Sequence, residues 1–275
     1  MGLSTRVSNG WEVAKASLKV LNAHKELIIF PILSGISILL VIAATFGFAF
    51  NSFGWRAADT GDTSSGAVYL VLFVFYVVNY FIVVFFNMGL MYCAKCYFDG
   101  ADTSVAKGLK FSLSRIHYIF LWAVFAGTVG TLLRMVQDKL GWLGKLFIGL
   151  IGLVWSAATF FVIPILAYEN VGPAEALKRS TGIMKEKWGT GITANFSIGL
   201  ISFLVIIVIA IAGTGISTLV NEQAGIVVMC LGILAVILIS SALQSILISA
   251  IYNQVSGNDN QHFADPLIKD LFVEK

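Results

Sequence analysis

Long runs of apolar residues alternate along the chain with short stretches that carry most of the charged side chains. Six runs have about the 20 residues that a helix needs to cross roughly 30 Å of hydrocarbon. They cover residues 27–50, 66–94, 116–136, 145–168, 191–220 and 225–252. Strands of a membrane barrel would instead alternate apolar and polar residues over about ten positions. The pattern therefore predicts an all-α integral membrane protein with six transmembrane helices.

Three short basic segments precede the odd-numbered spans, at residues 8–21, 102–116 and 171–189. Each sets lysines beside apolar residues at helical spacing, such as Val105, Leu109, Leu113 and Ile116 in the second segment. Helix-start residues are present as well. They are Asn9 with Glu12, the cap residues Asp102, Thr103 and Ser104, and Pro173. We expect three interfacial amphipathic helices, each with its apolar side toward the membrane.

The order of these elements predicts an internal repeat. One basic helix followed by two spans recurs over about residues 8–94, 102–168 and 171–252. The three repeats form a single membrane domain, residues 1–275, whose last part is a cytoplasmic tail at 253–275. All three basic helices would face the same side, so the repeats are parallel. The alternative is that helices made of Ala, Lys, Leu and Ser look alike by chance.

One segment carries a family resemblance. Residues 161–189, FVIPILAYENVGPAEALKRSTGIMKEKWG, resemble the Pro-x-x-x-x-Glu, Gly-Pro, Glu-Ala-Leu-Lys-Arg-Ser and Trp-Gly pattern of an uncharacterised prokaryotic family of six-span membrane proteins, labelled a domain of unknown function. Residues 11–35 and 250–272 fit the same family. The EALKRS helix is also similar to the membrane domain attached to some glycerophosphodiester phosphodiesterases. The resemblance implies the six-span fold and assigns no activity.

Composition supports a polytopic membrane protein. Of the 275 residues, 58% are hydrophobic and 12% are charged, whereas soluble domains are about 25% charged. The three cysteines are too few for a disulfide framework. The first apolar run is longer than the core of a cleavable signal peptide, which has about 7–15 residues.

Lysine and arginine predict the orientation. Fourteen of the 18 lie before the first span, in the connections after the second and fourth spans, or after the sixth span. The other four are Arg56, Arg134, Lys139 and Lys145. By the positive-inside rule both termini are cytoplasmic, and we expect the protein in a bacterial cytoplasmic (inner) membrane.

The position of the basic residues also indicates a partner. Because they lie beside apolar spans, anionic phospholipid is favoured over nucleic acid. A membrane partner protein or a second copy of the chain is the other partner considered. The residues predicted to bind lipid or a partner are Lys15, Lys19, Lys107, Lys110, Lys178, Arg179, Lys185 and Lys187.

No motif of an enzyme stands out. The sequence has no recognisable nucleophile triad, phosphate loop or metal cluster, and its polar segments are too short to bury a catalytic core. Cys93 and Cys96 form a C-x-x-C pair, but without further ligands we interpret them as packing residues and not as a redox or metal site. We expect no catalytic residue, cofactor or metal. An enzyme that acts on lipid within the bilayer is the least favoured hypothesis.

Polar residues inside the spans leave two interpretations. Asn79 lies in the second span, and Gln244 and Ser245 belong to a run of polar residues in the sixth. No ionisable residue lies at the centre of a span, which argues against a proton-driven transporter. Hydrogen bonds between helices are the favoured role. The alternative is a polar path through an oligomeric channel or permease for a small solute or ion.

Proline and small residues predict local features of the spans. Pro31 and Pro164 each remove a helical hydrogen bond and favour a kink. The pairs Ala123 with Gly127 and Gly152 with Ser156 have the spacing of close helix–helix contacts.

Overall fold

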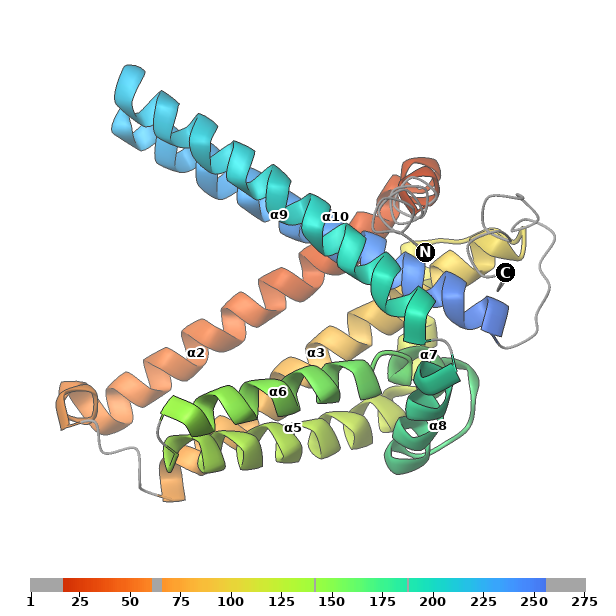
Figure 1. The fold of residues 1–275 in the computed structure, drawn as a ribbon, viewed down its shortest axis with the longest axis horizontal. Helices are drawn as coiled ribbons and strands as arrows, with labels where there is room; N and C mark the ends of the chain where they lie inside the picture. The colour runs from red at the N-terminus through yellow and green to blue at the C-terminus, as the bar shows by residue number, and fades with distance from the viewer. Residues whose placement is uncertain (1–16, 61–65, 141, 187, 256–275) are drawn as a thin grey trace. The chain divides into compact units, whose positions relative to one another are not determined.

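A computed structural model describes residues 17–60, 66–140, 142–186 and 188–255 (Figure 1). Within these ranges every regular element is a helix, which confirms the all-α prediction. Residues 17–23 are helical. They are followed by η1 (Lys25–Ile28), α2 (Ile29–Thr60), α3 (Gly66–Phe98), α4 (Val105–Ser114), α5 (Ile116–Asp138), α6 (Trp142–Ala158), α7 (Val162–Tyr168), α8 (Pro173–Glu186), α9 (Trp188–Leu219) and α10 (Glu222–Val255).

Six helical stretches are long and apolar enough to cross a membrane. They are Lys25–Phe48, Val68–Phe98, Ile116–Asp138, Leu146–Tyr168, Ile198–Leu219 and Glu222–Asn253. Each overlaps one of the six runs predicted from the sequence. The chain is therefore a multi-pass membrane protein.

The chain folds as two compact units. The first comprises Met1–Pro31, Leu90–Gly108 and Lys185–Lys275, and the second comprises Ile32–Gly89 and Leu109–Met184. Each unit combines segments that are far apart in the sequence. The predicted division into three repeats within one domain stays a prediction.

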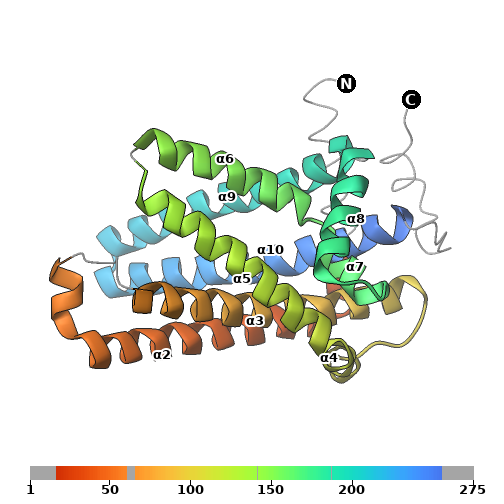
Figure 2. The ribbon, with the colours of Figure 1, turned by 90° about the horizontal axis from the view of Figure 1, so that it is seen from below.

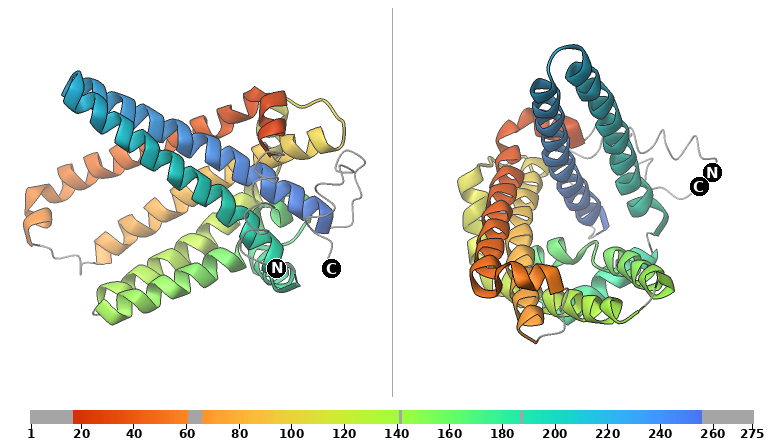
Figure 3. Two further views of the ribbon diagram at one scale, coloured as in Figure 1. Left: turned by 45° about the horizontal axis from the view of Figure 1, so that its top comes forward. Right: turned by 90° about the vertical axis from the view of Figure 1, so that its left-hand side faces the viewer.

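In the first unit α9 and α10 lie side by side near the turn that connects them and separate toward their other ends (Figures 1 and 3). Glycines allow this approach, because a Cβ atom on Gly225 would come within 2.5 Å of the carbonyl oxygen of Gly213 and of the Cβ of Ser217. The hydroxyls of Ser202 and Ser240 form a hydrogen bond of 2.6 Å between the same two helices. Small residues and hydroxyls thus hold this hairpin together.

In the second unit α5 packs against α6 and α3. The rings of Trp122 and Trp155 stack with centroids 6.1 Å apart. A Cβ atom on Gly127 would lie 2.7 Å from a methyl group of Val77 on α3, and Ala123 is fully buried. This confirms the predicted contact at Ala123 and Gly127.

The second predicted small-residue contact is wrong. No atom outside the helix lies within 4 Å of a Cβ built on Gly152, and Ser156 is exposed. Small residues at this spacing permit close packing but do not require it, and no neighbouring helix of the second unit approaches Gly152.

The fourth span is broken in two. Its first part, α6, ends at Ala158, and α7 begins at Val162 after a turn over residues 159–161. Pro164 follows at the third position of α7 and cannot donate the helical hydrogen bond that a continuous span would need. The predicted kink is confirmed as a break. Pro31 lies instead in the first turn of α2, where proline is tolerated.

In each unit the buried side chains gather at one end of the spans. In the second unit they include Met88, Ile119, Phe161 and Leu166, and in the first Leu27, Phe30, Met91, Ile246 and Ile251. The opposite ends of α2, α6, α9 and α10 expose leucine, valine and phenylalanine. Exposed apolar surface of this extent marks contact with a membrane or another protein.

Candidate functional site

The basic helices α4 and α8 contain most of the residues predicted to bind lipid. Lys107 and Lys110 lie on α4, and Lys178, Arg179 and Lys185 lie on α8. Lys19 is exposed on the helical residues 17–23. Lys15 and Lys187 lie outside the described residues.

Helix α4 begins at a hydroxyl cap. The Oγ of Ser104 accepts a hydrogen bond of 3.3 Å from the backbone N–H of Lys107, which confirms the helix start predicted there. The Nζ of Lys107 donates to the carbonyl oxygen of Asp102 at 2.9 Å. The ammonium of Lys107 therefore binds the loop that precedes its own helix.

A buried serine joins α4 to the second span. Ser112 is fully buried, and its hydroxyl donates a 2.8 Å hydrogen bond to the carbonyl oxygen of Phe85 on α3. Gly108, one turn earlier, is buried as well. Leu113 and Ile116, members of the predicted apolar stripe, are 55% and 43% exposed. The fully buried residues of α4 are thus small ones, whereas the predicted stripe is half-buried at Val105 and Leu109 and exposed at Leu113 and Ile116.

A second buried serine joins α8 to the fourth span. The hydroxyl of Ser180 accepts a 3.0 Å hydrogen bond from the backbone N–H of Phe161, and both residues are fully buried. Phe161 lies in the turn between α6 and α7. Ala176, one turn before Ser180, is also buried. In Figure 2, α8 runs across the direction of α6 and α4 lies at the start of α5.

The two helices share one five-residue pattern. Aligned on their Leu-Lys pairs, residues 108–112 (GLKFS) and 176–180 (ALKRS) each have a buried small residue, an exposed lysine and a buried serine. Both serines bond the backbone of the span that comes before them. Residues 17–21 (SLKVL) likewise begin with a buried small residue and have an exposed lysine, and the buried Leu21 stands in place of the serine. No described span precedes that segment, and an apolar residue suffices there.

Two arginines in the second unit bind side chains of the loop after α7, one through an ion pair and one through a hydrogen bond. The Nε of Arg179 lies 2.8 Å from a carboxylate oxygen of Glu169, whose side chain is 18% exposed against 60% for Arg179. Arg115 donates a hydrogen bond to the side-chain oxygen of Asn170. The charge of Arg179 is therefore shared with Glu169. Among the described residues, no ion pair involves Lys110, Lys178 or Lys185, and all three are exposed.

The polar residues of the second and sixth spans differ in their hydrogen bonds and burial. Asn79 donates a 2.8 Å hydrogen bond to the carbonyl of Phe75 in its own helix. On α10, Ser249 donates to the carbonyl of Met91 on α3 at 3.2 Å. Ser245 is buried and Gln244 is half-buried on α10, which belongs to the first unit, whereas Asn79 belongs to the second.

The cysteine pair lies at the end of α3. Cys93 is buried, and its thiol donates to the carbonyl of Ser104 at 3.4 Å, while Cys96 is partly exposed. In the part of the chain that the structure describes, no three His, Cys, Asp or Glu residues are grouped so as to hold a metal ion.

Comparison with known proteins shows that the chain matches one protein family. Residues 66–261 match the model of "Family of unknown function (DUF6159)". No curated protein matches the chain. The similarity to the membrane domain of glycerophosphodiester phosphodiesterases stays a prediction.

Proposed function

Since the chain belongs to DUF6159, a family of unknown function, we propose that it is a non-enzymatic multi-pass membrane protein whose basic helices engage anionic lipid. Helices α4 and α8 would lie at the cytoplasmic face of a bacterial inner membrane, as the distribution of lysine and arginine predicts. Their exposed lysines would contact lipid phosphates.

One observation carries this proposal: the lysines lie opposite the docked face of each helix. Successive residues of an α-helix turn by about 100°. Lys110 lies two residues from both Gly108 and Ser112, so it points away from the buried side of α4. Lys178 has the same relation to the buried Ala176 and Ser180 on α8.

The apolar stripe fills the sector between those two sides. On α4, Leu109 and Leu113 lie about 100° and 140° around the helix from Gly108. Leu113 is 55% exposed and Leu109 is half-buried. A helix with a docked face, an apolar face and a charged face in this order suits the boundary between headgroups and acyl chains. Long lysine side chains can reach the phosphates from there.

Each basic residue is expected to contribute only modestly to the binding of anionic lipid. A basic residue near an anionic leaflet contributes about 1 kcal/mol, and screening limits its reach to a Debye length of about 8 Å. Several lysines on docked helices act together, because the protein has already fixed their positions. The alternative of a channel has less support, since Ser202, Ser240 and Ser249 bind neighbouring helices.

The test is the melting temperature of the purified protein in nanodiscs with and without anionic phospholipid. Anionic lipid should raise the melting temperature of the wild type, and salt should reduce that rise. A variant with Lys110, Lys178 and Lys185 replaced by Gln should lose most of it. Lys139→Gln, on the opposite side in the predicted topology, is the control. Equal rises in wild type and triple variant would contradict the proposal.

A further inference from the structure

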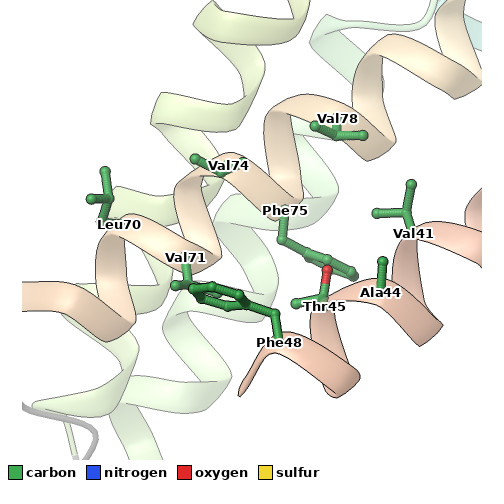
Figure 4. Close-up of a pocket in the computed structure, with 9 residues that line it drawn as sticks. All are labelled: Val41, Ala44, Thr45, Phe48, Leu70, Val71, Val74, Phe75 and Val78. Carbon is green, nitrogen blue, oxygen red and sulfur yellow. The ribbon is translucent and has the colours of Figure 1, made fainter. Parts of the chain in front are cut away.

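Two features of the second unit lie outside the lysine surface: a groove among its spans and the loop after α7. The groove lies between α2 and α3 and is lined by nine side chains, of which Thr45 alone carries a polar atom (Figure 4). It has almost no polar group that would select one ligand over another. The loop, residues 169–172, instead binds side chains on or next to both basic helices, α4 and α8.

Consecutive residues of this loop bind different helices. The carboxylate of Glu169 pairs with Arg179 on α8 at 2.8 Å. The side-chain oxygen of Asn170 accepts a hydrogen bond from Arg115, which directly follows α4. The backbone is extended at Glu169, with φ −108° and ψ 137°, and successive side chains of extended backbone point to opposite sides. The two neighbouring side chains can therefore reach two separate helices.

The partner of Asn170 is itself held by aromatic rings. The guanidinium of Arg115 lies 5.9 Å from the ring centroid of Phe111 on α4 and 5.7 Å from that of Tyr118 on α5, which is within the range of a cation–π contact. The ring of Phe111 also lies 6.2 Å from that of Tyr168, the last residue of α7. The junction of α4 with α5 therefore contacts the end of α7 through rings as well as through the hydrogen bond.

We propose that Glu169 and Asn170 are positioning residues that fix α8 relative to α4. The two buried serines do not join these helices, because Ser112 binds α3 and Ser180 binds the turn after α6, so each attaches its helix to a different span. The loop joins the two helices through contacts on adjacent residues. The exposed lysines of both helices then keep a fixed spacing, and the importance of that spacing for anionic lipid rests on the proposed function.

The experiment measures the distance between the two helices by pulsed electron spin resonance. The full-length protein, with its three cysteines replaced by Ser, carries spin labels at Leu113→Cys on α4 and Gly182→Cys on α8, both at exposed positions. It is studied in nanodiscs of neutral phospholipid, so the result does not depend on whether anionic lipid binds. The native loop should give a narrow distribution of distances, and Asn170→Ala should broaden it.

Three further variants separate positioning from general effects. Asn170→Asp keeps an acceptor oxygen for Arg115 and should keep the distribution narrow. Arg115→Gln removes the guanidinium from the other side of the same bond and should broaden the distribution as Asn170→Ala does. Asn221→Ala removes an exposed asparagine that caps α10 in the first unit, and it should leave the distribution unchanged.

A distribution as narrow in Asn170→Ala as with the native loop would overturn the proposal. Equal broadening in Asn170→Ala and Asn170→Asp would also overturn it, because the acceptor oxygen would then have no role. A broad distribution with the native loop would do the same. Failure of the proposed function would show instead in the melting temperatures with anionic lipid, which this measurement does not use.

Discussion

The backbone N–H of Phe161 donates a hydrogen bond of 3.0 Å to the hydroxyl of Ser180, and neither residue is exposed. The break before Pro164 places this N–H in a turn inside a candidate span. Backbone groups in hydrocarbon need a partner within the protein. The basic helix α8 supplies that partner, so the hydrogen bonding of the fourth span depends on the docking of α8.

Replacing Ser180 with Ala should therefore lower the melting temperature of the protein. The N–H of Phe161 would be buried without a partner, which costs about 1–3 kcal/mol. The measurement is the melting temperature in nanodiscs. Thr181→Ala is the control, because the hydroxyl of Thr181 bonds the carbonyl of Leu177 in its own helix. A control that destabilises as much as Ser180→Ala would mean that the bond to Phe161 has no special role.

Ser112→Ala should have a smaller effect than Ser180→Ala. The carbonyl of Phe85 lies inside α3 and keeps its helical hydrogen bond when the serine hydroxyl is removed. The expected loss is about 0.5–1.5 kcal/mol, measured in the same way. The reverse order of the two variants would show that an unpaired N–H at Phe161 is not the main cost.

Lys178 and Arg179 are neighbours but should respond differently to anionic lipid. Arg179 is paired with Glu169, whereas Lys178 is exposed with no ion pair among the described residues. Lys178→Gln should reduce the lipid-dependent rise in melting temperature more than Arg179→Gln does. Arg179→Gln should instead lower stability equally in neutral and anionic lipid, by at most about 1 kcal/mol because its side chain is 60% exposed. Similar lipid dependence of the two variants would argue against this division of roles.

Glycine 225 should not tolerate a side chain. A Cβ atom there would lie 2.5 Å from atoms of Gly213 and Ser217, so α9 and α10 would have to separate. Gly225→Ala should cost about 1–3 kcal/mol through overpacking. Gly215→Ala adds the same methyl group where no atom lies within 4 Å, and it should be neutral or stabilising because alanine favours the helix. The measurement is the melting temperature of the two variants. Equal melting temperatures would contradict the packing argument.

The spans could be predicted from the sequence because bilayer thickness sets the length of an apolar helix. The break in the fourth span was indicated by Pro164. The serine hydrogen bonds could not be predicted, since they join residues 19 and 27 positions apart whose proximity depends on tertiary packing. Their signal in the sequence is the recurring pattern of small residue, Leu, Lys, any residue and Ser at residues 108–112 and 176–180.

The leucine stripe of α4 shows a second limit of sequence analysis in membrane proteins. Periodicity identifies an apolar side of a helix but not what that side faces, because lipid is as apolar as leucine. Leu113 and Ile116 are exposed, while Gly108 and Ser112 pack against the protein. Small residues mark the protein side of α4.

The most direct test of the central claim measures which lipids surround α8. The exposed Gly182, which has open space beside it, can be changed to Cys in a variant with Cys93, Cys96 and Cys230 replaced by Ser, and labelled with a donor dye. Energy transfer is then compared for trace acceptor-labelled phosphatidylglycerol and phosphatidylcholine in nanodiscs. The account predicts more transfer to phosphatidylglycerol, lost at high salt and when Lys110, Lys178 and Lys185 are replaced by Gln. Equal transfer to the two lipids at low salt, in a labelled protein that melts like the wild type, would contradict it.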